Sequence, residues 1–202
     1  MADEKHLLKP LSLYAKSKVK VEKYILSFKG KTKVEPIILR FATAFGSSPR
    51  MRFDLTINQF IRELILNKKI LIYDANTWRP YCHVKDFSYL IEKILKFNKS
   101  NLAFEIFNAG DKKNNYTKKQ IINKIIKYIP EAKIEFQKHG EDPRNYRVNF
   151  SKVKKVLNFK ANYSVEKGIF EIIQFLKKNK KFLKKKKEIF GNYKINPKSI
   201  LS

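Results

Sequence analysis

Apolar residues recur at two spacings along the chain, and each spacing predicts one kind of element. Stripes with the spacing of one helix face occupy residues 13–28, 55–65, 86–95, 118–129, 151–157 and 165–176. Short apolar runs predict strands at 36–41, 70–73, 104–107 and 133–136, and 81–84 is expected to be extended. The largely apolar run at 36–41 predicts a buried parallel strand. Helices that alternate with strands predict an α/β fold.

Polar residues at the starts of these stripes predict helix caps. Asp54, Asp86 and Ser164 each stand at the beginning of a helical stripe, where a short polar side chain can accept a backbone N–H. Thr117 and Gln120 have the spacing of a capping box. Four of the helices therefore have a predicted first residue.

Composition limits the class of protein. The 202 residues are 43% hydrophobic, which is enough for one domain with a sizeable core. No apolar run approaches the ~18 residues of a membrane span, and no apolar signal region follows Met1, so a cytoplasmic protein is expected. A single cysteine, Cys82, excludes an internal disulfide and is most simply a core residue.

The formal net charge of +27 raises the alternative of a non-catalytic basic module that binds nucleic acid. The lysines, however, are spread along the chain together with many isoleucines and asparagines, a general compositional bias. Only residues 177–187 are dense enough to form a basic patch. Nucleic acid is therefore the less favoured partner.

The pair Tyr14 and Lys18 is the first candidate for chemistry. Residues four apart lie on one helix face, and a lysine ammonium favours the anion of a nearby phenol, whose reference pKa is about 10. Such a pair can exchange a proton with a substrate hydroxyl or carbonyl. The same spacing also occurs at Tyr81, Tyr89 and Tyr163. Only Tyr14 stands early on a helix that leads directly into an apolar strand.

Three further stretches accompany this helix, at residues 39–55, 78–86 and 142–148. The second reads R-x-x-x-H-V-x-D from Arg79, and the third begins Asp142-Pro143 and is followed by residues 157–159, Leu-Asn-Phe. With the helix at residues 10–18, these stretches resemble the extended short-chain dehydrogenase/reductase family, in particular its NAD-dependent sugar-nucleotide epimerases and dehydratases. The resemblance runs from about Pro10 to about Leu176.

The resemblance implies roles for individual residues. Tyr14 would be the catalytic acid/base and Lys18 would bind the nicotinamide ribose, so both would contact the cofactor, NAD or NADP. Arg79 would pair with the substrate diphosphate, for which a guanidinium has suitable geometry. Asn58 and Arg144 are further candidates for substrate contacts. His83 and Asp86 are expected to be a packed histidine and a helix cap, and no metal site is expected.

The resemblance also implies an activity and an architecture. The substrate would be a nucleotide sugar, one of whose hydroxyls is transiently oxidised, in the synthesis of surface-polysaccharide precursors. The fold would be the C-terminal part of a Rossmann-type parallel sheet plus a smaller mixed α/β substrate domain. Residues 1–48 would be a Rossmann remnant and 49–176 the substrate-binding region with returning Rossmann elements. Residues 177–202 would be a basic tail.

The sequence departs from the family in one respect. It contains no G-x-x-G-x-x-G turn, and the 13 residues before Tyr14 cannot supply a dinucleotide-binding half of about 100 residues. Weak NAD binding by this chain alone is expected. The alternatives are a truncated or inactive remnant, a late start codon, or a split enzyme completed by a second chain. A homodimer is a further candidate assembly.

Overall fold

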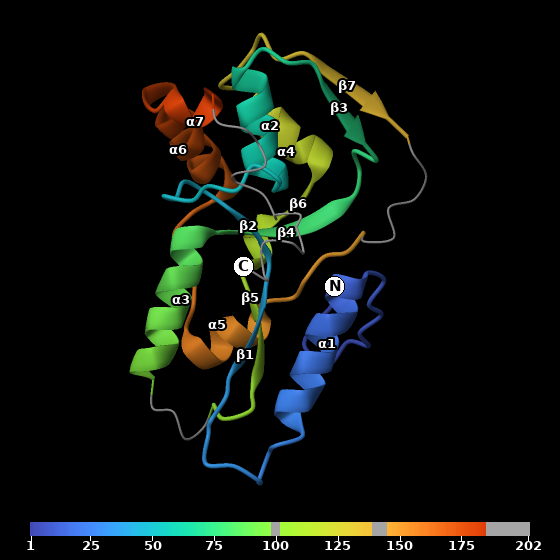
Figure 1. The fold of residues 1–202 in the computed structure, drawn as a ribbon, viewed down its shortest axis with the longest axis vertical. Coiled ribbons are helices and arrows are strands. Elements are labelled where there is room, and N and C mark those ends of the chain that lie inside the picture. Colours follow the sequence, from blue (N-terminus) through green and yellow to red (C-terminus); the bar gives the residue numbers. More distant parts are fainter. Residues whose placement is uncertain (98–101, 139–144, 185–202) are drawn as a thin grey trace, which may run out of the picture.

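The computed structural model describes residues 1–97, 102–138 and 145–184 (Figure 1). Its helices are α1 (Leu13–Leu26), α2 (Thr56–Ile65), α3 (Val84–Lys96), α4 (Lys118–Ile125), α5 (Ser151–Leu157), α6 (Val165–Lys178) and α7 (Lys181–Lys184), with a 3-10 turn η2 (Lys112–Asn114). The strands are β1 (Ile38–Phe41), β2 (Thr43–Phe45), β3 (Ile70–Tyr73), β4 (Trp78–His83), β5 (Ile106–Ala109), β6 (Asn115–Thr117) and β7 (Ile134–Gln137). The predicted α/β class is confirmed.

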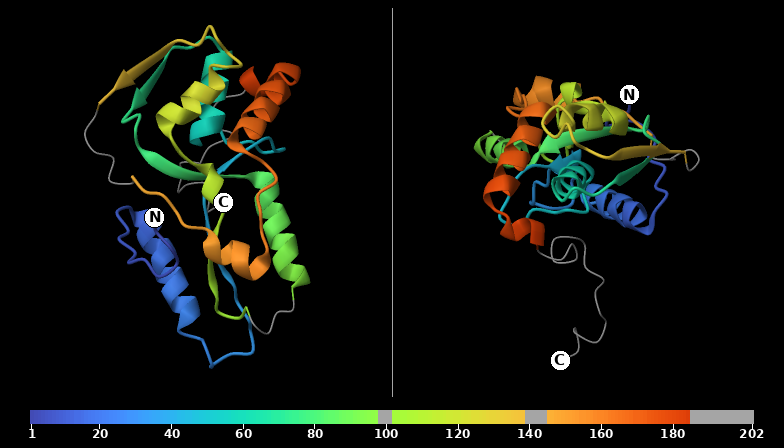
Figure 2. Two further views of the ribbon diagram at one scale, coloured as in Figure 1. Left: turned by 180° about the vertical axis from the view of Figure 1, so that it is seen from behind. Right: turned by 90° about the horizontal axis from the view of Figure 1, so that it is seen from above.

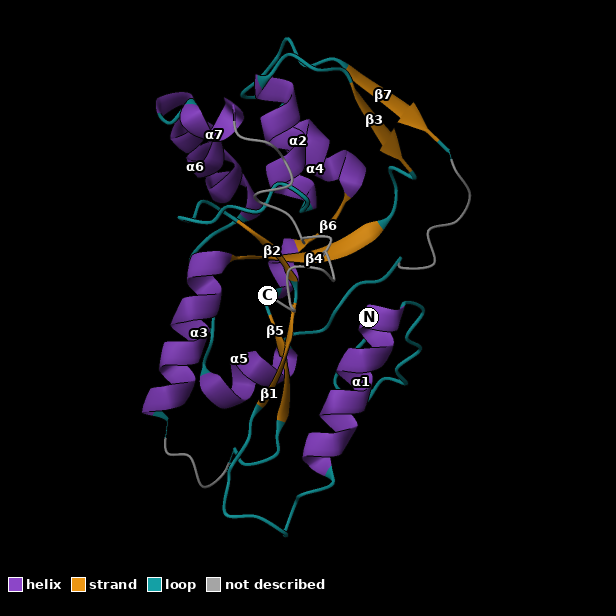
Figure 3. Ribbon diagram, in the orientation of Figure 1, coloured by secondary structure: helices purple, strands orange, loops and turns teal. Residues whose placement is uncertain are grey.

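The strands form three small sheets in the described part of the chain. β1 pairs in parallel with β5, and β3 pairs in parallel with β7. β4 lies between β2, to which it is parallel, and β6, to which it is antiparallel. The β2–β4–β6 sheet lies at the middle of the elongated molecule, with the other two sheets toward opposite ends (Figure 3).

Two hydrophobic cores lie on either side of this middle sheet. The α2–α4–α6 core is built from buried residues that include Phe45, Ile61, Tyr81, Ile122 and Ile169. The β1–β5 core contains Cys82, Leu90, Phe107, Val153 and Leu157, among others, and lies between α3, α5 and the two strands. Neighbouring residues of one strand, such as Tyr81 and Cys82, face different cores because side chains alternate along a strand.

Two of the four predicted caps are present, counting the capping box as one. Ser164 accepts the backbone N–H of Lys167, and Thr117 and Gln120 form the complete capping box. Ser12, which precedes the first helical stripe, also caps α1 by accepting the N–H of Ala15.

Two other predicted caps are wrong. Asp54 instead forms an ion pair with Arg52, so that α2 begins after Leu55 without a side-chain cap. Asp86 lies inside the first turn of α3, and the cap is the imidazole of His83, which accepts the N–H of Lys85. In both places a short polar residue had a better partner than the nearest helix N–H groups.

The strand predicted at 36–41 is parallel, but the prediction that it is buried is wrong. Phe41 is 47% exposed, and the other residues of β1 are only partly covered. β5 is the one strand that pairs with β1 among the described residues. α1, which lies beside β1 at the outside of the molecule (Figure 2), contains no buried residue. Cys82 is buried as predicted, and burial raises the pKa of its thiol.

Candidate active site

Tyr14 and Lys18 lie one turn apart on α1 and face one another. The Lys18 ammonium is 5.4 Å from the centre of the Tyr14 ring. The Tyr14 side chain is exposed, and so is Lys18. The structure therefore brings this pair together on an accessible surface, as their spacing in the sequence predicts.

A cavity of about 450 Å³ borders the same helix. Ala15 and Val19 of α1 line one side, and Phe41, Ala42 and Asn108 line another at the carboxyl ends of β1 and β5. In open α/β sheets, ligands bind outside the carboxyl ends of the parallel strands. The position of the cavity is therefore that of a ligand site.

The N-terminal segment closes part of this cavity. Ala2 forms a parallel bridge with Val148, and the carboxylate of Glu4 accepts the backbone N–H of Asn108 at 2.9 Å. Arg40 of β1 donates to the backbone oxygen of Glu4 at 3.1 Å. The same guanidinium forms two hydrogen bonds with Glu22 of α1, of 2.9 and 2.5 Å. Arg40 thus fixes both the segment and α1 against β1.

Arg79 lies at the start of β4, on the strand face that also carries Tyr81. Its guanidinium is 5.4 Å from the centre of the Tyr146 ring, and it donates to the backbone oxygen of Trp78 at 2.9 Å. Tyr146 also lines the cavity. Arg79 is therefore oriented over an aromatic ring that borders the candidate site.

Tyr81 is a polar residue of this region that the sequence pattern did not single out. Its side chain is fully buried, and its phenol oxygen has no hydrogen-bond partner among the described residues. Burial raises the pKa of the phenol to about 12, although the Arg79 guanidinium and the nearby Thr56 hydroxyl oppose the rise. Alternation along the strand could have indicated it, because Tyr81 stands two residues after Arg79.

Asn58 is buried at the start of α2 and binds the loop that follows β2. Its amide oxygen accepts the N–H of Gly46 at 3.2 Å, and its amide nitrogen donates to the backbone oxygen of Arg52 at 3.0 Å. Asn58 therefore holds the shape of residues 46–52. Its predicted contact with substrate stays a prediction. Arg144 lies outside the described residues.

Arg52, in the loop after β2, has a weak electrostatic interaction with Tyr14 of α1. The pKa of the Arg52 guanidinium is raised, first by its hydrogen bond to Asp54 and then by electrostatic interactions with Asp54 and Tyr14, whereas burial opposes the rise. Tyr14 and Arg52 are thus within electrostatic range, although they are far apart in sequence. The loop connects the surroundings of Tyr14 with the buried end of α2.

Neither a metal centre nor a membrane helix is found in the described parts of the chain. Residues 1–97, 102–138 and 145–184 contain no group of three or more His, Cys, Asp or Glu side chains placed to hold a metal ion. No helix within these ranges is long and apolar enough to cross a membrane.

Comparison with known proteins identifies the family. A model described as the NAD dependent epimerase/dehydratase family matches residues 1–110, which is more than half of the chain. An uncharacterized protein of Methanocaldococcus jannaschii is 30% identical over 179 residues, which are 87% of this chain and 53% of that protein. The chain belongs to the NAD dependent epimerase/dehydratase family. The resemblance seen in the sequence motifs is confirmed.

Named members of this epimerase/dehydratase family are among its relatives. A UDP-glucuronate 4-epimerase of Thermodesulfobacterium geofontis is 29% identical over 179 residues, covering 87% of this chain and 53% of the relative. The dTDP-glucose 4,6-dehydratase of Bacillus anthracis, solved in complex with NAD, superposes with a TM-score of 0.77 at 27% identity. The match covers 90% of this chain and 58% of the dehydratase.

The fold of the family is shared at lower identity as well. The UDP-glucuronic acid 4-epimerase of Bacillus cereus, solved with UDP-glucuronic acid and NAD, has a TM-score of 0.77 at 24% identity over 87% of this chain and 56% of that structure. The chain spans about half the length of the curated relatives it matches. It therefore has the Rossmann-type α/β architecture of the family over that part.

Proposed function

We propose that this chain carries the acid/base pair and the substrate side of an NAD-dependent nucleotide-sugar epimerase or dehydratase. The observation that carries the proposal is the Tyr14–Lys18 pair beside a cavity at the carboxyl ends of β1 and β5. The relatives support the substrate class, because two of them are named for UDP-glucuronate or dTDP-glucose. The product would be used in the synthesis of surface polysaccharides.

In the proposed reaction, Tyr14 exchanges a proton between its phenol oxygen and a sugar hydroxyl. The Lys18 ammonium, one helical turn away, stabilises the phenolate that accepts this proton. NAD, when bound, would accept and return a hydride. Tyr14 and Lys18 would contact the nicotinamide end of that cofactor. The sequence contains no glycine-rich strand-to-helix turn that would bind its pyrophosphate.

The diphosphate of the substrate is proposed to bind near Arg79. The Arg79 guanidinium and the Thr56 hydroxyl both act on the pKa of the Tyr81 phenol, which places the three groups in one neighbourhood. Thr56 begins α2, whose first N–H groups have no side-chain cap and therefore favour an anion. Asn58 would help by fixing the adjoining loop, and Arg144 stays a predicted contact.

The open edge of β1 is proposed to receive the remainder of the dinucleotide-binding fold. On one side of this edge lies α1. This helix has no buried residue, and its apolar Leu13 side chain is 84% exposed. The other side carries the exposed apolar side chains of Phe41 and Ile91. A further parallel strand with helices on both faces would cover these surfaces and supply the pyrophosphate contacts. It would come from polypeptide outside these 202 residues.

Reconstitution tests this function. The chain is combined with the part of the T. geofontis epimerase that it does not match, and turnover of UDP-sugars is measured. Replacement of Tyr14 by Phe removes the proton-transferring hydroxyl, so kcat is expected to fall about 100-fold or more. Tyr24→Phe is the matched control, because Tyr24 is an exposed tyrosine of the same helix whose ring packs edge-on against Phe28.

The two variants separate catalysis from folding. Tyr24→Phe is expected to turn over UDP-sugars like the parent. If Tyr14→Phe also retains the parental kcat in a complex that is active, Tyr14 is not the acid/base and the proposed mechanism is wrong.

A further inference from the structure

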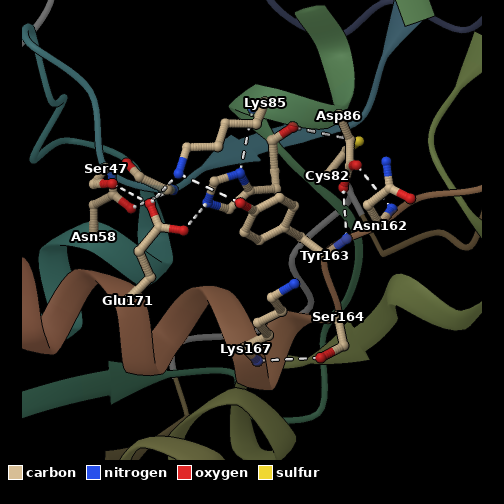
Figure 4. Close-up of polar contacts among 12 residues, drawn as sticks. Ser47, Asn58, Cys82, Lys85, Asp86, Asn162, Tyr163, Ser164, Lys167 and Glu171 are labelled. Carbon is tan, nitrogen blue, oxygen red and sulfur yellow. Dashed lines mark hydrogen bonds and ion pairs between the residues drawn. The ribbon is translucent and has the colours of Figure 1, made fainter. Parts of the chain in front are cut away.

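Four polar side chains meet between the two hydrophobic cores, and we call them the waist junction: Ser47, His83, Lys85 and Glu171. Figure 4 labels Ser47, Lys85 and Glu171 of this group. The Glu171 carboxylate, on α6, accepts a hydrogen bond from the Ser47 hydroxyl and one of 3.1 Å from the Lys85 ammonium. Its second oxygen lies 3.5 Å from Nε2 of His83. One carboxylate of α6 therefore connects two other segments of the chain, the loop after β2 and the junction of β4 with α3.

These segments are places where the chain passes from one core to the other. Ser47 follows β2, which begins next to Ala42 of the β1–β5 core and ends at Phe45 of the α2–α4–α6 core. His83 and Lys85 lie where β4 leads into α3. Contacts at these positions therefore act on the relative placement of the two cores.

Near the same place, Asp86 binds another segment that passes from one core to the other. Its buried carboxylate accepts the backbone N–H of Asn162 at 2.8 Å and that of Tyr163 at 3.1 Å. Residues 160–164 lead from Phe159 of the β1–β5 core to Val165 of the α2–α4–α6 core. The segment is thus attached to α3 just before α6 begins (Figure 4).

The packing around His83 leaves no space for rearrangement. The ring is fully buried, stacks on Tyr163 at 4.1 Å with a 12° angle between the planes, and meets the Phe45 ring edge-on at 5.2 Å. A Cβ atom at Gly46 would overlap the imidazole, and one at Gly168 would lie 3.0 Å from its Cδ2. Gly46 therefore has to be glycine while His83 keeps this place, whereas Gly168 is restricted mainly by the Phe45 ring.

The charges of the junction are complementary. Nδ1 of His83 accepts the N–H of Lys85, so a neutral ring carries its proton on Nε2, which faces Glu171. Burial would raise the pKa of Glu171, but hydrogen bonds from Ser47 and Lys85 bring it below its ordinary value. The carboxylate is therefore charged at neutral pH and attracts both Lys85 and the Nε2–H.

We propose that the waist junction is a positioning clamp in which Glu171 fixes the α2–α4–α6 core relative to the β1–β5 core. Its functional consequence rests on the proposed function: the clamp keeps the part of the site around Arg79 correctly positioned relative to Tyr14. Glu171 contacts neither residue and acts through the placement of the cores.

A distance measurement between the cores tests the clamp in the chain alone. Spin labels are attached at Lys119→Cys on α4 and Lys155→Cys on α5, both exposed positions. Cys82 is buried with a raised pKa and stays unlabelled. In the parent, one narrow distance distribution is expected. Glu171→Gln keeps the size of the side chain but removes its charge, and it is expected to broaden or shift the distribution.

Glu166→Gln is the matched control for this measurement. Glu166 lies on the same helix and pairs with Lys124 at 3.2 Å, within the α2–α4–α6 core region and away from the junction. It is expected to leave the distribution unchanged. A purely structural role of Glu171 would lower the melting temperature of Glu171→Gln without changing the distances. Identical distributions in the parent and both variants overturn the clamp.

The reconstituted enzyme tests whether the clamp affects catalysis. Because Arg79 lies in one half of the site and Tyr14 in the other, Glu171→Gln is expected to lower kcat about 10- to 100-fold through misplacement, with KM for the UDP-sugar little changed. A parental kcat together with altered distances overturns the functional consequence of the clamp. If even the parent is inactive, the proposed function has failed, and the distance measurement alone decides the clamp.

Discussion

The imidazole of His83 gives stability a pH dependence of predictable sign. Burial is the main cause that lowers its pKa from 6.5 to about 4; Lys85 and Lys167 add to this, and Glu171 opposes it. Between these two pH values the unfolded chain binds more protons than the folded one. The contribution of the neutral His83 ring to the free energy of unfolding is therefore complete above pH 6.5 and is lost as the pH falls toward 4. From the size of the shift, the loss is up to about 3 kcal/mol.

Urea unfolding at several pH values measures this contribution. His83→Asn retains an acceptor for the N–H of Lys85 but does not titrate, so its free energy of unfolding is expected to fall less between pH 6.5 and 4 than that of the parent. His6→Asn changes an exposed histidine and serves as the control. Parallel curves for the parent and His83→Asn would mean that the buried ring is not held neutral.

At the scale of single residues, the sequence predicted local relations better than distant ones. Tyr14 and Lys18 are four residues apart, so helical geometry alone brings them together. Glu171 and Ser47 are 124 residues apart, and no local pattern indicates that they touch. Tyr81 was set aside as a chance match to the Tyr-x-x-x-Lys spacing. Its importance depends on burial beside Arg79, which only the folded chain reveals.

At the scale of elements, α6 illustrates how packing overrides helix propensity. Alanine is favoured over glycine in a helix by about 1 kcal/mol, so Gly168→Ala should stabilise an isolated helix. In this protein the new methyl group would overlap the ring of Phe45 and press on His83. Overpacking of this kind costs about 1–3 kcal/mol, which outweighs the gain.

Thermal unfolding of Gly168→Ala is expected to show a melting temperature several degrees below that of the parent, at roughly 2–4 °C per kcal/mol. Gln174→Ala, at an exposed position of the same helix, is expected to stay near the parent. A melting temperature of Gly168→Ala at or above the parental value would show that the α6 contact with Phe45 and His83 is loose.

The predicted elements were mostly correct; the errors lay at their ends and in two short strands, β2 and β6, that were not predicted. The helix predicted over 118–129 ends at Ile125, and the extended segment predicted at 81–84 begins earlier, as β4 at Trp78. Asp54 and Asp86 were assigned as caps from their position alone. Each found another partner, Arg52 for the first and the backbone of Asn162 and Tyr163 for the second. The partner of Asp54 is local and that of Asp86 is distant, and in both cases the choice between partners depends on the folded backbone.

At the scale of the whole molecule, the two sides of the proposed site differ in how deeply their supporting side chains are buried. The surroundings of Arg79 rest on a core of fully buried residues such as Ile61 and Ile169. The Tyr14 helix has no buried residue, and its Leu13 and Tyr24 side chains are largely exposed. The substrate side is therefore expected to form in this chain alone, whereas the dinucleotide side needs further polypeptide.

Calorimetric titration of the 202-residue chain with UDP-glucuronic acid and with NAD tests this division most directly. The account predicts saturable binding of the UDP-sugar and no saturable NAD binding up to about 1 mM, a limit of about −4 kcal/mol. Arg79→Ala is expected to weaken UDP-sugar binding about tenfold or more, because a charge-assisted bond to the diphosphate is lost. Lys155→Ala, which removes one positive charge from α5, is expected to bind like the parent. Micromolar NAD binding by the chain alone, or UDP-sugar binding that is absent or indifferent to Arg79→Ala, would contradict the account.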